Sequence, residues 1–417
     1  MSGPLAVRFV ATALLLLAGG HQVAAFVGRE PAARELSPAA IERLEALGYE
    51  PWVAERRPPR RTGVVHHVPE RAADGYVLFA SRGACSAELI DRHGAVLHRW
   101  AGPVRGFWSD TELLRDGSLL VVGADSDDRV RQQEDRFLRR LAWDATTIWE
   151  ADLPAHHDVE ALPDGRILTI SSQVRTIDDG GTPRTIVDDE VVLLDDAGKV
   201  LETRSLFDAF AATPGVAVYG LDRRGVDIGG SVAVDVFHTN SVEWIDLPQL
   251  AGTHPVYAPG NVLVSMRHQN AIAVLDRSRG GLAWVWGSGV LDGQHSARML
   301  ASGNILVFDN GLRRKRSRVL EIDPRRAPAD AVVWEFDGGD AERFFTTGGG
   351  ASQRLPNGNT LVTVTGQGRL LEATPDGELV WAFANPTRDA HTTRRATIHA
   401  SKWLPAEYVL PIVARNG

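Results

Sequence analysis

Short apolar runs separated by Asp, Asn, Gly and Pro turns follow one another along the chain from about Tyr76 onward. Runs of this kind, rich in β-branched and aromatic residues, are typical of β-strands. An earlier segment, Ser37–Gly48 (SPAAIERLEALG), has a helical period instead, with Ile41, Leu44 and Leu47 on one face. It begins with a hydroxyl cap and a proline at the first helical position, which favours a helix start there. The pattern therefore predicts one short helix followed by a long all-β region.

A hairpin motif repeats through the β region. Leu162–Leu168 (LPDGRIL) returns as Leu355–Leu361 (LPNGNTL), with looser copies at Leu114–Leu120 and Leu300–Leu306. An Asp-Gly or Asn-Gly pair between two apolar runs indicates a tight β-hairpin. A second Asp/Gly turn follows each copy, often before a tryptophan such as Trp381. Each unit therefore contains two hairpins, which make a four-stranded antiparallel sheet.

Six such units begin near residues 76, 107, 155, 236, 293 and 349. Repeated four-stranded sheets of this length predict an all-β fold, a six-bladed β-propeller with a short N-terminal helical extension. The first unit is short, and we expect a strand from the other end of the chain to complete it. That closure would remove free sheet edges. The third unit carries a long polar insertion around Arg175–Asp189, and Leu206–Gly230 separates it from the fourth; we expect these segments to shape access to the channel.

The N-terminal segment indicates export. Arg8 precedes a short apolar core at Phe9–Leu17, and small residues follow up to Ala25. The core is shorter than the roughly 20 residues that span a bilayer, so a cleavable signal is the favoured interpretation. An uncleaved membrane anchor is the alternative. The predicted organisation is a signal peptide or anchor over 1–25, a helical extension and linker over 26–70, and the propeller over 71–417.

Composition narrows the class of protein. The 417 residues include 41 glycines and 11 tryptophans, and the formal net charge is −8, which gives no reason to expect nucleic acid. A single cysteine, Cys85, excludes an intrachain disulfide and a zinc site built on paired cysteines.

Three histidines mark a candidate site. His157 and His295 each lie five residues before the leucine of a repeated hairpin, so they occupy equivalent positions in two blades. His238 stands before the next strand pair with a predicted shift of one residue. The innermost strands of a propeller line its channel, so we expect these side chains to converge at one end of the channel.

Convergent histidines fit two chemistries. Three neutral imidazoles could bind a catalytic metal, or one could act as a nucleophile while cationic groups hold an anion. Arg267 lies where a strand of the His238 blade ends, and its guanidinium would repel a metal but clamp sulfate or phosphate. Phe107, Trp108 and Phe237 are candidates for an aromatic rim, with core packing as the alternative.

Several motifs resemble the bacterial arylsulfate sulfotransferases. The resemblance runs through roughly residues 76–390 and rests on Phe237–Val242 (FHTNSV), Ser265–Ile272 (SMRHQNAI) and Gly293–Gly311 (GQHSARMLASGNILVFDNG). The His-His-Asp of residues 156–158 and the Leu-Pro-Asn-Gly-Asn of 355–359 also fit.

The resemblance implies a six-bladed propeller in the bacterial periplasm or cell envelope. It implies transfer of a sulfuryl group from a phenolic sulfate ester to a phenolic acceptor, through a sulfohistidine and without a nucleotide sulfate donor. The implied nucleophile is His295, with His157, His238 and Arg267 as further catalytic residues. Asn240, Gln294 and His268 are the implied substrate-binding residues, with no metal and no cofactor.

Partners and alternatives follow from the same interpretation. The expected partners are a small aryl sulfate donor and a phenolic acceptor, with no nucleic acid; a membrane tether and a homodimer stay open. One alternative is a non-catalytic exported propeller that binds a ligand through the channel. Another is a metal-dependent propeller lyase or hydrolase that uses the three histidines. The terminal tryptophans raise a weaker third alternative, a quinone-dependent dehydrogenase.

Overall fold

The computed structural model describes residues 50, 52–53, 61–102, 106–126, 135–228, 230–339, 343–391 and 393–417. The predicted signal peptide, the helix expected over 37–48 and most of the linker lie outside the described residues. Among the helices that are described, none is long and apolar enough to cross a bilayer.

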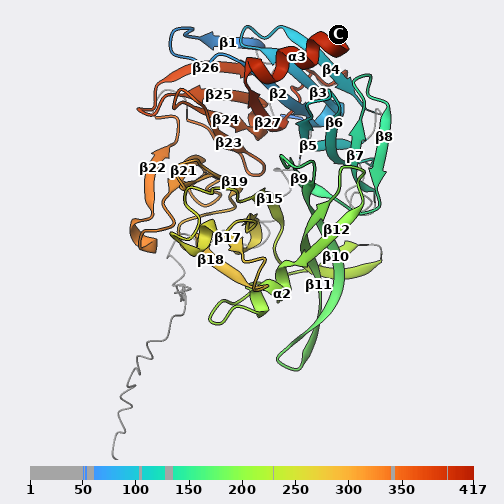
Figure 1. Ribbon diagram of the computed structural model, residues 1–417, viewed down its shortest axis with the longest axis vertical. Helices are drawn as coiled ribbons and strands as arrows, with labels where there is room; N and C mark the ends of the chain where they lie inside the picture. The colour runs from blue at the N-terminus through green and yellow to red at the C-terminus, as the bar shows by residue number, and fades with distance from the viewer. Residues whose placement is uncertain are drawn as a thin grey trace, which may run out of the picture.

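Six antiparallel sheets form the described part of the chain, each with its strands ordered from the channel outward (Figure 1). Blade 1 is β27 (Ile398–Leu404), β2 (Tyr76–Ser81), β3 (Ser86–Asp91) and β4 (Val96–Ala101); blade 2 is β5 (Phe107–Leu113), β6 (Leu119–Ala124), β7 (Arg136–Leu141) and β8 (Thr147–Ala151); blade 3 is β9 (His156–Ala161), β10 (Ile167–Asp179), β11 (Thr182–Leu194) and β12 (Val200–Ser205).

The last three blades repeat this order, and together the six confirm the predicted β-propeller. Blade 4 is β15 (Thr239–Trp244), β16 (Val262–Met266), β17 (Ala271–Leu275) and β18 (Leu282–Trp286); blade 5 is β19 (His295–Met299), β20 (Ile305–Asp309), β21 (Arg318–Ile322) and β22 (Val332–Phe336); blade 6 is β23 (Ala351–Arg354), β24 (Thr360–Val364), β25 (Arg369–Ala373) and β26 (Leu379–Ala384).

Both ends of the described chain close the ring. The innermost strand of blade 1 is β27, which pairs with β2 from Tyr76↔Leu404 to Ser81↔Ile398. In Figure 1 the red β27 lies beside the blue β2. At the periphery, β1 (Gly63–His67) extends blade 6 by pairing with β26. The strand expected from the far end of the chain is therefore β27.

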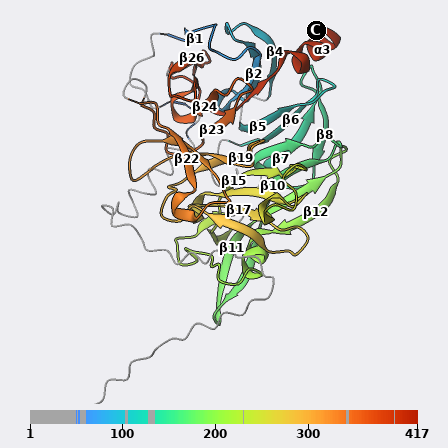
Figure 2. The same cartoon turned by 60° about the vertical axis from the view of Figure 1, so that its left-hand side comes forward.

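The predicted insertion of the third unit is an elongated hairpin. Strands β10 and β11 have 13 residues each and pair without interruption from Ile167↔Leu194 to Asp179↔Thr182. The hairpin projects beyond the other blades (Figures 1 and 2). Its flank is extended by β14 (Ser231–Asp235), which pairs in parallel with β11 and antiparallel with β13 (Val226–Ile228). The short helix α2 (Leu206–Ala211) links blade 3 to this flank.

The hydrophobic core consists of clusters between neighbouring blades. In the described residues each of the six blade interfaces holds one cluster. Between blades 6 and 1, for example, Phe383 packs against Phe79 with ring centroids 5.2 Å apart. The C-terminal helix α3 (Ala406–Asn416) adds Val409 and Ile412 to the cluster between blades 1 and 2. Burial of apolar area at all six interfaces supplies the main stabilisation of the ring.

The tryptophans that end the repeats connect neighbouring blades. Each indole N–H donates to a turn carbonyl of the following blade: Trp149 to Asp196, Trp286 to Pro328, Trp334 to Pro375 and Trp381 to Arg92, over 2.8–3.1 Å. A buried or half-buried indole normally finds such a partner. These tryptophans therefore have a structural role, and the weaker cofactor interpretation loses the observation on which it rested.

The innermost strand of each blade has one edge without a neighbouring strand. Acidic side chains accept hydrogen bonds from several backbone N–H groups along these edges. The carboxylate of Asp110 accepts from Val159 N, that of Asp158 from Val242 N, and that of Glu160 from Trp244 N. In the same way Glu243 accepts from Met299 N, and the amide oxygen of Gln353 accepts from Trp403 N. Each bond joins one blade to the next. Channel-facing carboxylates thus replace the missing backbone partners of edge strands.

Two cations hold these carboxylates in place. Arg298 donates to Asp158 over 2.9 Å and to the carbonyl of Val242, and Lys402 lies 3.3 Å from Asp110. Burial is the largest single influence and would raise the pKa of Asp158, but Arg298, Lys402 and hydrogen bonds together outweigh it, so the net pKa is lowered. Burial dominates elsewhere and raises the pKa of Asp110 to about 7 and that of Glu160 to about 8. The channel therefore carries carboxyl groups that are protonated in part near neutral pH.

Replacing Glu160 with Gln is expected to stabilise the protein at pH 8 and to change little near pH 4.5. The pKa of Glu160 is raised in the folded state, so the folded state is penalised as pH rises from the unfolded pKa towards about 8. The glutamine keeps an oxygen for Trp244 N and removes that penalty. We expect a gain of ~1–3 kcal/mol at pH 8 from denaturant unfolding. A difference independent of pH would contradict the assignment.

Candidate active site

Local irregularity at the start of the innermost strands aims side chains at one end of the channel. Five of the six described inner strands carry a register shift there, and only β23 is regular. His157, His238 and Ser296 have φ of +66°, +49° and +52° at these points. Left-handed backbone at non-glycine residues is uncommon and gathers at functional sites, as do β-bulges.

The strand register corrects one sequence-based position. Leu162, Leu300 and Ile245 each begin the corresponding turn with the same backbone hydrogen bond. Counted back from Ile245, the position equivalent to His157 and His295 is Asn240, and His238 lies two residues earlier. The predicted shift of one residue was wrong because blade 4 has a longer turn in place of the Pro-Asp-Gly sequence. His238 nevertheless reaches the others, since its ring centroid is 5.1 Å from that of His157.

The tautomer of His295 is fixed by Asn310. The Asn310 amide nitrogen donates to the carbonyls of Thr346 and Gly349, both over 2.9 Å. Its oxygen must therefore face His295 Nδ1, 2.8 Å away, and accept a hydrogen bond from the Nδ1–H group. The carbonyl of Gly293 is a second acceptor at 3.0 Å. With the proton on Nδ1, the lone pair of the neutral ring lies on Nε2.

His295 is kept neutral by its surroundings. The side chain is buried, and its pKa is lowered well below the usual value by burial first and by the Arg267 cation second. Nε2 accepts a hydrogen bond from Gly349 N over 3.1 Å. Gly349 has φ +64°, and a Cβ there would come within 2.7 Å of the Thr365 side chain. A glycine at this position therefore allows the backbone to approach the imidazole.

Arg267 begins η4 (Arg267–Gln269), directly after the second strand of blade 4. It is buried, and Nη2 donates to the carbonyl of Thr347 over 3.2 Å. A Cβ at Gly293 would lie 3.9 Å from Arg267 Nε, which places the guanidinium beside the turn that carries His295. The structure therefore brings a fixed cation next to this imidazole.

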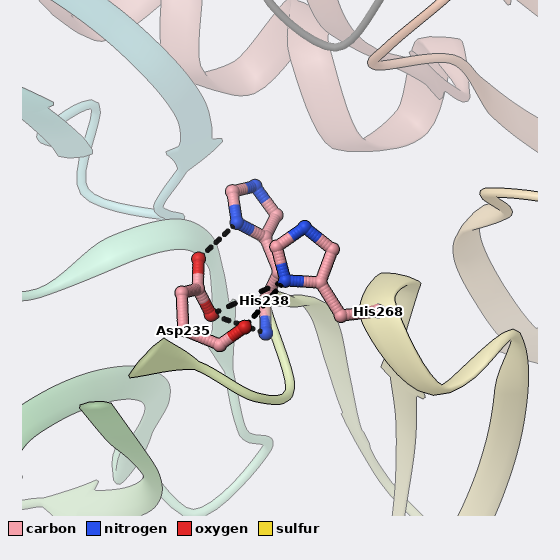
Figure 3. A group of neighbouring side chains, drawn as sticks. All are labelled: Asp235, His238 and His268. Atoms are coloured by element: carbon pink, nitrogen blue, oxygen red, sulfur yellow. Dashed lines mark hydrogen bonds and ion pairs between the residues drawn. The ribbon is translucent and has the colours of Figure 1, made fainter. Parts of the chain in front are cut away.

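Asp235, His238 and His268 form a compact group (Figure 3). His238 Nδ1 is 2.5 Å from Asp235 Oδ2, and His268 Nδ1 is 2.7 Å from the backbone carbonyl of Asp235. Burial would raise the pKa of Asp235, but the two histidines hold it well below the usual value. Because His238 Nδ1–H donates a hydrogen bond to the Asp235 carboxylate, the lone pair of the neutral ring lies on Nε2, which can act as a base.

A second histidine pair lies beside this group. His157 Nδ1 is 2.7 Å from His156 Nδ1, and His156 Nε2 is 3.4 Å from Asp189. Asp189 favours a proton on His156 Nε2. His156 Nδ1 then carries a lone pair and accepts a hydrogen bond from His157 Nδ1–H. Burial first, and then neighbouring histidines and Arg136, lower the pKa of His157 well below its usual value. His156 therefore positions His157.

Two site residues were missed by the sequence analysis. His399 lies on β27, with its ring centroid 6.2 Å from that of His157, and burial together with Arg82 lowers its pKa to about 3. Arg82 begins η1 (Arg82–Ala84) in blade 1, the same place that Arg267 has in blade 4. Its guanidinium lies 4.0 Å from the ring centroid of Phe107. Two buried arginines from separate blades therefore flank the histidines.

Asn240 and Gln294 brace the segment that carries His295. Asn240 donates to the carbonyl of Gln294 over 2.9 Å and accepts from Ser296 N. The Gln294 side chain is fully buried, and its amide nitrogen is shared among Ser265, Met266 and Ala271. This arrangement differs from the substrate-binding role expected for Gln294, because its donor is already used within blade 4.

The expected aromatic rim is not formed by two of its three candidates. Trp108 and Phe237 are buried in the clusters between blades, and Phe237 packs on Phe210. Both side chains face a neighbouring blade, which the sequence pattern alone did not reveal. Phe107 is half-buried under Arg82.

The metal alternative involves different residues from those expected. Among the described residues, the set with ligand atoms within 4.8 Å of one another is Asp235, His238 and His268. Two histidines and one carboxylate suit a divalent ion with open positions. Both Nδ1 atoms are already hydrogen-bonded to Asp235. Burial is the main cause that lowers the pKa of His238, and the charge of Arg267 adds to it. The geometry thus favours a role for these residues in proton transfer over metal binding. Metal analysis of the protein tests the alternative.

Comparison with known families decides the relationship. The family model of the arylsulfotransferases (ASST) matches residues 133–386, which is more than half of the chain and contains His157, His238, Arg267 and His295. The chain belongs to the arylsulfotransferase family. Among curated proteins, none matches this arylsulfotransferase significantly.

Solved structures share its architecture at low sequence identity. A protein of unknown function from Bacteroides caccae is 12% identical, with a TM-score of 0.51 over 80% of this chain and 99% of its own, which supports the fold alone. A nidogen/laminin complex (13% identity, TM-score 0.44, 78% and 97% covered) and a streptogramin B lyase (10%, 0.40, 85% and 97%) are more distant.

Proposed function

We propose that this arylsulfotransferase moves a sulfuryl group from a phenolic sulfate ester to a phenolic acceptor through a sulfohistidine at His295, without a nucleotide sulfate donor. The observation that carries the proposal is the environment of His295. Asn310 fixes its tautomer, burial and Arg267 lower its pKa, and the result is a neutral imidazole next to a cation. A nucleophile and an anion-binding group side by side are what transfer of an anionic group needs.

The first step is attack of His295 Nε2 on the ester sulfur. An N–S bond forms, the S–O bond to the aryl group breaks, and the aryl oxide leaves with the electron pair. Gly349 N then loses its acceptor on Nε2 and can donate to a sulfuryl oxygen instead. Arg267 offsets the charge of the sulfuryl group as it redistributes.

The second step returns the enzyme to its starting state. A phenol oxygen attacks the sulfur, the N–S bond breaks with its electron pair returning to Nε2, and the phenolic proton goes to a base. His238 suits this role because its Nδ1–H donates to Asp235, which puts the basic lone pair of the neutral ring on Nε2. In the next catalytic cycle, His238 can give this proton to the departing aryl oxide when that oxide is a poor leaving group.

A chromogenic donor tests the proposal. Purified protein is incubated with 4-nitrophenyl sulfate, with and without phenol, and with no nucleotide present. Nitrophenolate release that depends on phenol, together with formation of phenyl sulfate, is the expected result. Release that is independent of any phenol would indicate hydrolysis, and no release at all would contradict the proposal.

Arg267→Met is expected to move the acid limb of the pH–rate profile towards higher pH. Protonated His295 cannot attack, so kcat/KM falls on the acid side as the pH passes the pKa of His295. That pKa is well below 6.5, with Arg267 the second-largest cause after burial. Loss of the cation raises it, and the rate at neutral pH falls by ~10²-fold as well. Arg279→Met, at an exposed ion pair, is the control; an unmoved acid limb would count against the arrangement.

A metal-dependent hydrolase or lyase is the second candidate, favoured only by the Asp235–His238–His268 group. Metal analysis of the purified protein and the effect of a chelator on turnover distinguish the two. Activity that survives chelation supports the sulfohistidine route, since that route needs no metal.

We also propose that the protein is exported to the bacterial periplasm or cell envelope. The support is the sequence of residues 1–25, with a basic residue, a short apolar core and small residues at its end. Cell fractionation of the full chain, with N-terminal sequencing of the product, tests export and cleavage together.

A further inference from the structure

A groove lies between blades 2 and 3. Its volume is about 680 Å³, and it is lined by Arg136 of β7, Glu150–Pro154 at the end of β8 and after it, Ser172–Val174 of β10 and Val187 of β11. One wall is therefore the elongated β10–β11 hairpin, where Val174 and Val187 are direct cross-strand neighbours. Small-molecule sites commonly have volumes of about 300–1,000 Å³.

Two residues of the groove also line the histidine site. A smaller recess is lined by Arg136, His156, His157, Val187, Asp189, Asp235 and His238. Arg136 and Val187 line both spaces. The two spaces are therefore adjacent, and a ligand whose reacting group reaches His157 and His238 can extend towards the groove.

The lining indicates what kind of molecule fits. Leu153, Pro154, Val174 and Val187 give apolar surface, and Ser172 and Gln173 add neutral hydrogen-bonding groups. Arg136 donates to Ser172 over 3.2 Å, and its charge helps lower the pKa values of His156 and His157. It stands where the recess and the groove join, so it can meet the anionic end of a ligand. Glu150 and Asp152 at the other end disfavour a second negative charge.

We infer that this groove is the aryl subsite of the transferase and that it takes phenolic compounds of more than one ring, uncharged apart from the sulfate group. The inference rests on the proposed function for its ligand class. The apolar side chains of the β10–β11 hairpin contact the ring system, and Arg136 guides the sulfate towards the histidines. The long insertion in the third unit thus sets substrate size.

Binding measured without turnover tests the subsite. In a His295→Ala background, 4-methylumbelliferyl sulfate is titrated by calorimetry against the protein with and without Val174→Trp. The indole is placed on the groove wall, and we expect the Kd for this two-ring ester to rise at least about tenfold. The one-ring ester phenyl sulfate should be affected less than about threefold, because it needs little of the groove.

Val200→Trp is the matched control. Val200 lies on the outermost strand of the same blade with 41% exposure, against 40% for Val174, and lies outside the groove. We expect it to leave both Kd values unchanged. Asp152→Trp, on the opposite wall, repeats the test if Val174→Trp does not fold.

The outcomes separate this inference from the proposed function. If the wild type turns over aryl sulfates but neither tryptophan weakens two-ring binding, the groove assignment is wrong and the transfer proposal stands. If the tryptophans weaken binding but the wild type shows no phenol-dependent turnover, the groove stands as a binding site and the transfer proposal fails. Failure of the unmodified groove to bind the two-ring ester overturns the subsite.

Discussion

His295→Ala is expected to abolish sulfuryl transfer, with kcat reduced by at least about 10⁴-fold. In the proposed mechanism the His295 imidazole supplies the nitrogen that bonds to sulfur, and an alanine side chain cannot form that bond. His157 and His238 have Nε2 lone pairs of their own, but neither has the Asn310 contact that fixes the tautomer of His295. Phenol-dependent nitrophenolate release measures the loss.

His391→Ala is the control for this substitution, since His391 lies in an exposed turn. It should retain full activity. Retention of more than about a tenth of the activity by His295→Ala would assign the nucleophile elsewhere. Binding of the aryl sulfate to the variant, as measured for the groove, shows whether the site is still formed.

Arg298→Met is expected to destabilise the protein by ~3–5 kcal/mol at pH 8, the cost of removing one partner from a buried ion pair. Arg298 donates to Asp158, and its charge faces Asp110, Glu160 and Glu243. Without it, these carboxyl groups have higher pKa values in the folded state. The folded state is then penalised as pH rises, so the loss should shrink at pH 5.

Denaturant unfolding at both pH values measures this effect. Arg279→Met, which removes an ion pair at a largely exposed arginine, should cost at most about 1 kcal/mol. A cost at Arg298 no larger than at Arg279 would show that the channel carboxylates do not depend on the cation.

The repeated hairpins were enough to predict the blades. Turn chemistry is local, so Leu162–Leu168 and Leu355–Leu361 mark a blade wherever they occur. The short first unit also predicted closure by a distant strand, which is β27. The family resemblance was confirmed over residues 133–386.

The missing part of the site depended on tertiary structure. His399 lies on β27, which leads into α3 and lacks the turn motif used to align the other blades. Arg82 had a usable signal, since Ser81-Arg82 and Met266-Arg267 both end the second strand of a blade. That comparison of blades 1 and 4 would have found it.

Some side-chain directions could not be predicted from spacing. Register shifts at the start of the inner strands change which side of a blade each residue faces, because the side-chain period of a strand is two. Trp108 therefore packs between blades, and His156 supports His157. The partners Asp235 and Asn310 come from segments that only the folded ring brings to His238 and His295.

Mass spectrometry of the covalent intermediate tests the central claim most directly. The protein is mixed with 4-nitrophenyl sulfate in the absence of phenol, quenched at alkaline pH and digested. A mass increase of about 80 Da on the peptide that carries His295, removed by adding phenol before the quench, is the predicted result. Phenol-dependent turnover without that adduct, or with an adduct on another residue, would contradict the sulfohistidine at His295.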